Sequence, residues 1–152
     1  MKLAGSQTVP AGRERAYNLL QDPEVLARCI PGCDTLLRVG PDEYEMKMRM
    51  SIASIQSLFG GKVRLAGQKP PESFRMLVEG TSKVGFMKGD GLLTLAPAGE
   101  LTEIRYEGDV QVGGMIAGVG QRLLDTTAKY LIRKFFEKLA GEMESGQTPP
   151  SA

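Results

Sequence analysis

The sequence predicts an α+β fold in which a curved, seven-stranded antiparallel sheet packs against one long C-terminal helix. Three observations predict it: a strand followed by two short helical patterns, then six further strands, then a helical stretch that continues almost to the end. A length of 152 residues suits one domain. We assign 1–144 to this domain and expect 145–152, which is rich in Ser, Gly and Pro, to be a flexible tail.

The first strand is predicted at Lys2–Val9, and two short helices should follow it. Pro10 is suited to the start of the first helix, which carries apolar residues up to Leu20. The second helix is predicted from Asp22 to Cys29, because the Pro-Gly pair after Ile30 ends it. The two helices therefore separate the first strand from the second.

The remaining strands are separated by glycine- and proline-containing breaks, and at least two of them alternate strictly between apolar and polar residues. In the segment from Tyr44 to Ile52, the apolar residues, including three methionines, share one face. Such alternation indicates an antiparallel sheet with one wet and one buried side. The predicted strands are Thr35–Val39, Glu43–Ala53, Leu58–Gly67, Ser73–Lys83, Phe86–Leu95 and Thr102–Val112.

The C-terminal stretch from Gly113 through Met143 is predicted to form a single amphipathic helix. A helix of this length reaches roughly 40 Å, so it must cross the whole sheet. Its polar side comprises Arg122, Asp125, Lys129, Arg133 and Glu137, and its apolar side Leu124, Ala128, Leu131, Phe135 and Leu139.

Composition excludes several classes of function. A net charge of +1, with basic and acidic residues interspersed, is not typical of a nucleic-acid-binding protein. The absence of histidine removes the commonest general base and most zinc sites. No signal-peptide core and no apolar run of about 18 residues is present, so we expect a cytoplasmic protein with reduced cysteines.

The remaining candidates for chemistry are weak. Asp90 lies between glycines, and we expect a turn or bulge residue there rather than a buried acid. Cys29 and Cys33 lack the spacing of a redox pair and are interpreted as packed thiols. The glycines of 113–120 do not match a phosphate-binding loop and instead indicate a close helix–sheet contact or a portal.

The interior is unusually rich in methionine, a flexible residue that fills irregular space and adapts to ligands of varied shape. Two interpretations stay open: these residues pack an ordinary core, or they line a space for an apolar ligand. The residues concerned are Met46, Met48, Met50, Met76, Met87 and Met115.

The sequence resembles the family of the G subunit of carbon monoxide dehydrogenase, within the larger group of helix-grip proteins that includes the START and Bet v 1 proteins. The likeness spans nearly the whole chain, and the order of elements agrees with it. The matching segments are Ile30–Cys33, Gly61–Leu65, Tyr106–Leu124 and Lys134–Phe136.

This resemblance implies a hydrophobic cavity between sheet and helix, no catalytic residue, no metal and no covalent cofactor. Members are accessory proteins of molybdenum hydroxylases such as carbon monoxide dehydrogenase. They are associated with recruiting the enzyme to the membrane and with carrying a lipid or quinone. We therefore expect a non-enzymatic carrier of a lipid or isoprenoid quinone, with molybdenum hydroxylase subunits as partners and a peripheral contact with the inner face of the cell membrane.

Many members carry a further linker and a hydrophobic C-terminal segment, which the sequence up to Ala152 does not contain. The residues expected to line the cavity are Met48, Met50, Phe74, Met76, Phe86, Tyr106, Val119, Leu123, Thr127 and Leu131. Tyr106 and Thr127 would supply its polar contacts.

Two other functions remain open. A pure adaptor would bind the dehydrogenase with a dry, filled core. A cyclase or aromatase of the helix-grip group would hold a reactive chain in the cavity, with Asp90 or Tyr106 as the acid.

Overall fold

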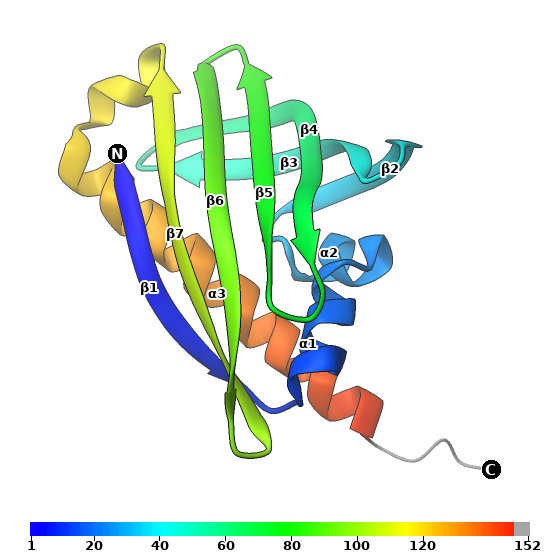
Figure 1. Cartoon of the computed structure of the whole chain (residues 1–152). Helices are drawn as coiled ribbons and strands as arrows, with labels where there is room; N and C mark the ends of the chain where they lie inside the picture. The colour runs from blue at the N-terminus through cyan, green and yellow to red at the C-terminus, as the bar shows by residue number, and fades with distance from the viewer. Residues whose placement is uncertain (148–152) are drawn as a thin grey trace.

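The computed structural model describes residues 1–147 and confirms the predicted α+β fold (Figure 1). Seven strands, two short helices and one long helix follow in the predicted order. The elements are β1 (Lys2–Val9), α1 (Arg13–Leu20), α2 (Pro23–Cys29), β2 (Cys33–Gly40), β3 (Glu43–Ile52), β4 (Ile55–Lys69), β5 (Ser73–Ser82), β6 (Gly85–Ala98), β7 (Leu101–Gly113), the 3₁₀ turn η1 (Met115–Val119) and α3 (Gln121–Gln147).

The strands form one sheet in the order β1-β7-β6-β5-β4-β3-β2, and every neighbouring pair is antiparallel. Figure 1 shows β2 and β3 running across the direction of β5, β6 and β7, so that the sheet curves around one side of α3. Within β4, a Cβ atom on Gly61 would lie 1.7 Å from the carbonyl oxygen of Glu79, so only glycine fits there. The curved sheet thus has an inner face toward α3 and an outer face.

The inner face is apolar because the strands alternate as predicted. Tyr44, Met46, Met48, Met50 and Ile52 are all buried, whereas the residues between them are exposed. One end of this core is covered by α1 and α2, whose buried residues include Tyr17, Leu20 and Leu26.

Local sequence signals explain where α2 begins. The Asp22 side chain accepts a hydrogen bond from the Glu24 N–H at 2.9 Å and caps the helix, and Pro23 occupies its first turn. The start of this short helix is therefore set by the residues of its own first turn.

The single helix predicted from Gly113 to Met143 is wrong at its N-terminal end. Gly114 and Gly120 have φ angles of 80° and 98°, which a right-handed helix does not allow. The chain therefore forms η1 first, and α3 begins only at Gln121. The helix continues to Gln147, inside the segment expected to be a tail; residues 148–152 lie outside the described part of the chain.

Candidate functional site

The two halves of α3 pack very differently against the rest of the molecule. In the C-terminal half, Phe136, Leu139 and Met143 are buried in the core. In the N-terminal half, Leu124 is buried, whereas Leu123, Thr127, Ala128 and Leu131 are only half-buried. Apolar surface of the sheet-facing helix therefore remains partly accessible near η1.

The inner face of β6 and β7 carries glycine at neighbouring inward positions. On β6, Gly89 and Gly91 have the same strand parity as the buried Leu93, and Gly91 pairs with Gly108 of β7. A Cβ atom on Gly91 would meet only the carbonyl oxygen of Glu107 within 4 Å, at 3.7 Å. The inner face therefore carries no side chain at Gly89 or Gly91, whereas a Cβ atom on Gly108 would lie 2.6 Å from the Asp90 carbonyl oxygen, so close strand packing requires glycine there. We call Gly89, Gly91 and Gly108 the glycine floor.

Tyr106 of β7 lies against both α3 and β1. Its ring stacks on Phe136 of α3, with centroids 5.9 Å apart and planes at 22°. Its hydroxyl group lies over Gly5 of β1, where a Cβ atom would come within 2.4 Å of the hydroxyl oxygen. Gly5 is thus required for Tyr106 to lie flat against β1, and the phenol hydroxyl lies on the β1 side of β7, whereas Gly89 and Gly91 belong to β6 on its other side.

Six of the ten residues predicted to line a cavity are half-buried inner-face residues of the sheet, η1 or α3. They are Met76, Tyr106, Val119, Leu123, Thr127 and Leu131. Met48 and Met50 also face inward but are buried in the core. Phe74 is completely buried and packs edge to face on Tyr17 of α1, with centroids 5.6 Å apart. Phe74 therefore belongs to the solid core beneath α1.

The predicted inward position of Phe86 is wrong. Phe86 is 45% exposed on the outer face, because the buried Leu93 and Leu95 fix the odd-numbered residues of β6 as inward. Its neighbour Met87 faces the interior instead. The same odd-numbered alternation in the sequence is the signal that identifies Gly89 and Gly91 as inner-face residues.

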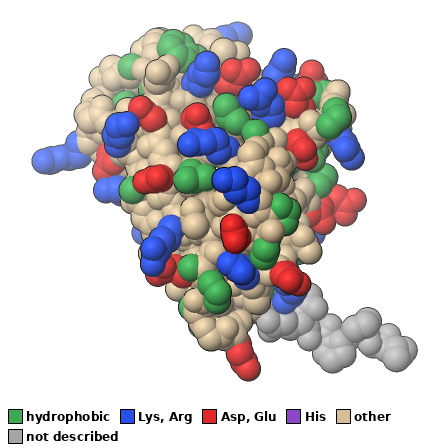
Figure 2. Space-filling model, viewed as in Figure 1, with side chains coloured by type: hydrophobic (Ala, Val, Ile, Leu, Met, Phe, Trp, Pro, Cys, Tyr) green, Lys and Arg blue, Asp and Glu red, His purple; other side chains and the backbone are tan. Residues whose placement is uncertain are grey.

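Two surface grooves lie mainly on the outer face of the sheet. One, of about 480 Å³, is lined by outer-face side chains that include Leu37, Lys47, Lys62 and Phe86. The other, of about 490 Å³, lies over β1, β7 and β6 and includes Arg105 and Glu107. Figure 2 shows basic and acidic side chains interspersed over the visible face, with apolar side chains scattered between them. An apolar ligand in either groove would stay in contact with charged groups and water.

Ionisable groups in the described residues give no sign of a reactive centre. Asp90 lies in a regular part of β6 on the outer face, 3.1 Å from Arg75, so the expected turn or bulge is wrong. Burial raises the pKa of the Cys29 thiol to about 11 and also raises that of Cys33, so both are protonated at neutral pH. Within residues 1–147, no group of three or more His, Cys, Asp or Glu residues is placed to hold a metal ion.

The comparisons with known proteins concern the family and the fold. A sequence profile of the family of the carbon monoxide dehydrogenase G subunit (CoxG) matches residues 5–144. The chain belongs to the CoxG family. A search of curated protein sequences finds no significant match.

Solved structures resembling this CoxG-family chain include a conserved protein from Geobacillus kaustophilus. It is 32% identical, with a TM-score of 0.92 over 95% of this chain and 96% of the other. A START superfamily protein from Mycobacterium smegmatis is 14% identical, with a TM-score of 0.72 over 95% and 97%.

The ZhuI aromatase/cyclase from Streptomyces sp. R1128 is 12% identical, with a TM-score of 0.68 over 100% of this chain and 98% of the other. The last two likenesses concern the fold, which is START-like. Among residues 1–147, no helix is long and apolar enough to span a membrane.

Proposed function

We propose that this protein is a non-enzymatic accessory protein that holds an apolar molecule between the glycine floor and the N-terminal half of α3. The proposal is supported by two observations: glycines at neighbouring inward positions of β6, and half-buried apolar residues in the N-terminal half of α3. A core that had only to be stable would place large side chains at Gly89 and Gly91, because leaving that space empty forfeits packing energy.

The chemistry of the surrounding residues favours a lipid or an isoprenoid quinone. The half-buried inner-face residues are apolar apart from Tyr106 and Thr127. Burying hydrocarbon yields about 0.8 kcal/mol per CH₂, so a long chain needs no charged partner for tight binding. The two hydroxyl groups are sufficient to orient one polar head group.

Membership of the CoxG family supports a role beside a molybdenum hydroxylase such as carbon monoxide dehydrogenase. In this role the bound molecule would connect the enzyme to the membrane, either by recruiting it there or by accepting its electrons. The protein itself would supply binding and no chemical step.

The decisive experiment compares three proteins purified from cells that make quinones: the wild type, Gly91→Leu and Gly60→Leu. Native mass spectrometry and analysis of an organic extract measure bound ligand. Gly91→Leu adds a large side chain at the glycine floor and should abolish loading, whereas Gly60→Leu adds the same side chain where nothing lies within 4 Å, in the outer groove, and should retain it.

A second inner-face variant, Leu123→Trp, should act like Gly91→Leu. An apo wild type that takes up no added quinone or lipid contradicts the proposal. Ligand lost in Gly60→Leu but kept in Gly91→Leu would place the site in the outer groove instead.

One observation favours the pure adaptor. Met48 and Met50 are buried in the core, as they would be in a dry interior. An adaptor predicts binding of the dehydrogenase by wild type, Gly91→Leu and Leu123→Trp alike, with no ligand in any of them. For the cyclase alternative, Asp90 lies on the outer face and cannot be the acid, so Tyr106 is the remaining candidate. Tyr106→Phe would abolish any turnover that depends on this hydroxyl group.

A further inference from the structure

One end of the molecule is formed by two segments that contact each other, the β5–β6 turn and the chain through η1 into α3. The Ile116 N–H donates a hydrogen bond to the Val84 carbonyl oxygen at 2.9 Å, and Phe86 pairs with Gly113 across β6 and β7. We call residues 82–88 and 113–124 together the hairpin–η1 end. In Figure 1 it lies at the opposite end of the sheet from α1 and the β6–β7 turn.

This end exposes two large apolar side chains. Met115 is 64% exposed and Phe86 is 45% exposed, while Ile116 between the two segments is buried. Phe86 lies over Gly113, where a Cβ atom would come within 2.1 Å of its ring. Large exposed apolar residues on adjoining segments are typical of a surface that inserts into another apolar phase.

The charge of the hairpin–η1 end is entirely positive. Its two segments contain Lys83, Lys88 and Arg122 and no acidic residue. None of these three cations makes an ion pair within 4.0 Å with another described residue. Of the nearest acids, Glu79 lies across from Lys88 on β5, and Asp125 pairs with Lys129 at 3.0 Å.

We propose that the hairpin–η1 end docks on a bilayer that contains anionic lipid, with Met115 and Phe86 entering the interface and the three cations contacting head groups. This inference rests on the proposed function, because an apolar ligand is exchanged most directly where its site approaches a membrane. The half of α3 that carries the half-buried apolar residues begins at this same end, because η1 leads directly into α3. Unpaired cations around apolar tips complement an anionic lipid surface.

The test is co-sedimentation of the protein with two kinds of vesicle. One consists of phosphatidylcholine alone, and in the other three lipids in ten are phosphatidylglycerol. Wild type should bind the anionic vesicles more strongly, and the binding should weaken at high salt. Lys83→Glu and Arg122→Glu should each lower partitioning at least about fivefold, because each basic residue near an anionic surface contributes about that much. Met115→Ser should weaken the binding that remains at high salt.

Two variants at the opposite end provide matched controls. Leu101→Ser replaces an apolar residue that is 43% exposed in the β6–β7 turn region, and Lys69→Glu reverses an exposed cation at the end of β4. Both should bind vesicles as the wild type does. An equal loss of vesicle binding in the controls and in the hairpin–η1 variants would overturn the proposal.

The ligand content of every variant is measured by native mass spectrometry on the same samples. If the wild type retains ligand but does not bind anionic vesicles, the proposal of membrane docking is overturned and the proposed carrier function is not affected. The wild type could instead bind neither ligand nor vesicles and bind a dehydrogenase subunit through Lys83 and Arg122. That result would make this end a protein-binding surface and would overturn both proposals.

Discussion

The two halves of α3 differ in what they do for the fold. The C-terminal half is buried against the sheet and bonded to both short helices: Arg15 of α1 donates to the Met143 carbonyl oxygen at 2.6 Å, and Arg28 of α2 pairs with Glu142. The N-terminal half carries half-buried apolar residues and is joined to the sheet through η1 and two glycines of positive φ. Burial and hydrogen bonding are therefore concentrated at the end of the sheet next to α1 and α2, which we call the closed end.

The closed end is also connected at the start of β7. Thr102 is completely buried, and its hydroxyl group donates to the Ala11 carbonyl oxygen at 2.7 Å. This bond joins β7 to the segment between β1 and α1. Such a buried, satisfied polar contact stabilises the closed end in addition to its apolar packing.

The largest expected effect comes from truncating leucines in the two halves. Leu139 is completely buried, so Leu139→Ala should cost about 2–5 kcal/mol in the free energy of unfolding. Leu123 is half-buried, and Leu123→Ala should cost about 1 kcal/mol or less, because a partly exposed site can relax and hydrate. Urea denaturation of both variants measures the difference.

Equal costs at Leu139 and Leu123 would show that the two halves are packed alike. Bound ligand must be extracted before the comparison, since a ligand that binds only the folded state adds its own stabilisation.

The next effect concerns the glycines that interrupt the helix before α3. Gly120 has φ 98° and ψ 152°, a conformation essentially restricted to glycine, so Gly120→Ala should cost about 1–3 kcal/mol locally. Gly118 has an ordinary φ and nothing within 4 Å of an added Cβ, so Gly118→Ala should be neutral or slightly stabilising. Hydrogen exchange of residues 113–124 measures this local change.

Faster exchange in Gly120→Ala with unchanged exchange around Leu139 would confirm that η1 opens independently of the closed end. The same acceleration in Gly118→Ala would instead attribute the effect to any added side chain.

A smaller effect is expected at the bond between α1 and α3. Arg15→Ala removes the donor to the Met143 carbonyl oxygen and should cost about 1 kcal/mol by thermal or urea unfolding. Arg13→Ala, at the start of the same helix, is the matched control and should change stability by less than about 0.5 kcal/mol. If both variants are neutral, packing alone joins α1 to the C-terminal half of α3.

Much of the fold can be predicted from the sequence because its strands alternate. Alternation predicts the buried residues of β3, and the Asp-Pro pair that caps α2 predicts where that helix begins. The break at Gly120 escapes such a prediction because its neighbours, from Val119 to Leu124, have helical apolar spacing. Only the backbone angle of Gly120 shows that the helix begins after it.

The candidate site is harder to predict, because its defining residues have no side chains. A search for large apolar residues finds Met76 and Leu123 but passes over Gly91, which leaves the space. The prediction for Phe86 fails for a related reason: it assumes that a large residue at the start of β6 points inward, although alternation with Leu93 and Leu95 places it outside. Strand parity is therefore a better guide to such a site than residue size.

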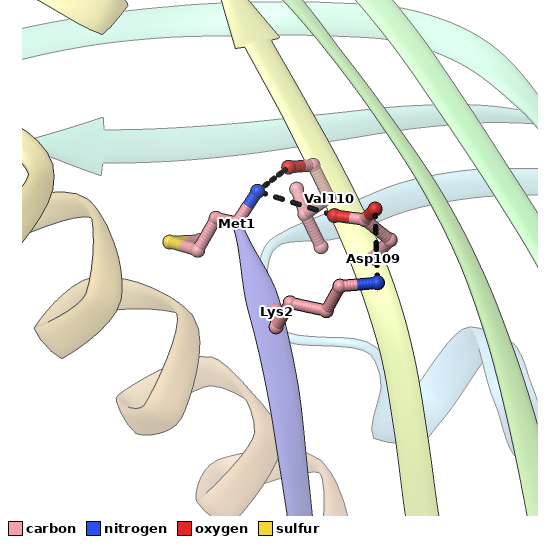
Figure 3. Close-up of polar contacts among 4 residues, drawn as sticks. All are labelled: Met1, Lys2, Asp109 and Val110. Carbon is pink, nitrogen blue, oxygen red and sulfur yellow. Dashed lines mark hydrogen bonds and ion pairs between the residues drawn. The ribbon is translucent and has the colours of Figure 1, made fainter.

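The smallest expected effect concerns the open end of β1, where the N-terminal ammonium group contacts β7 (Figure 3). It donates to the Asp109 carboxylate at 3.2 Å and to the Val110 carbonyl oxygen at 2.8 Å, and Lys2 lies 3.7 Å from the same carboxylate. The hydrogen bond from the ammonium group, together with its charge, lowers the pKa of Asp109 below its usual range.

A lowered carboxyl pKa stabilises the folded state above the ordinary titration range of aspartate, and the stabilisation is lost as the pH falls through the folded-state pKa. Asp109→Asn should therefore lower the melting temperature slightly at pH 7, and the difference from wild type should disappear at acidic pH, below about pH 3. Because the group is exposed, added salt should also reduce the difference. A difference that persisted at low pH would mean that Asp109 acts through its hydrogen bond and not through its charge. The start of β1 would then be held mainly by the contact between the ammonium group and the Val110 carbonyl oxygen.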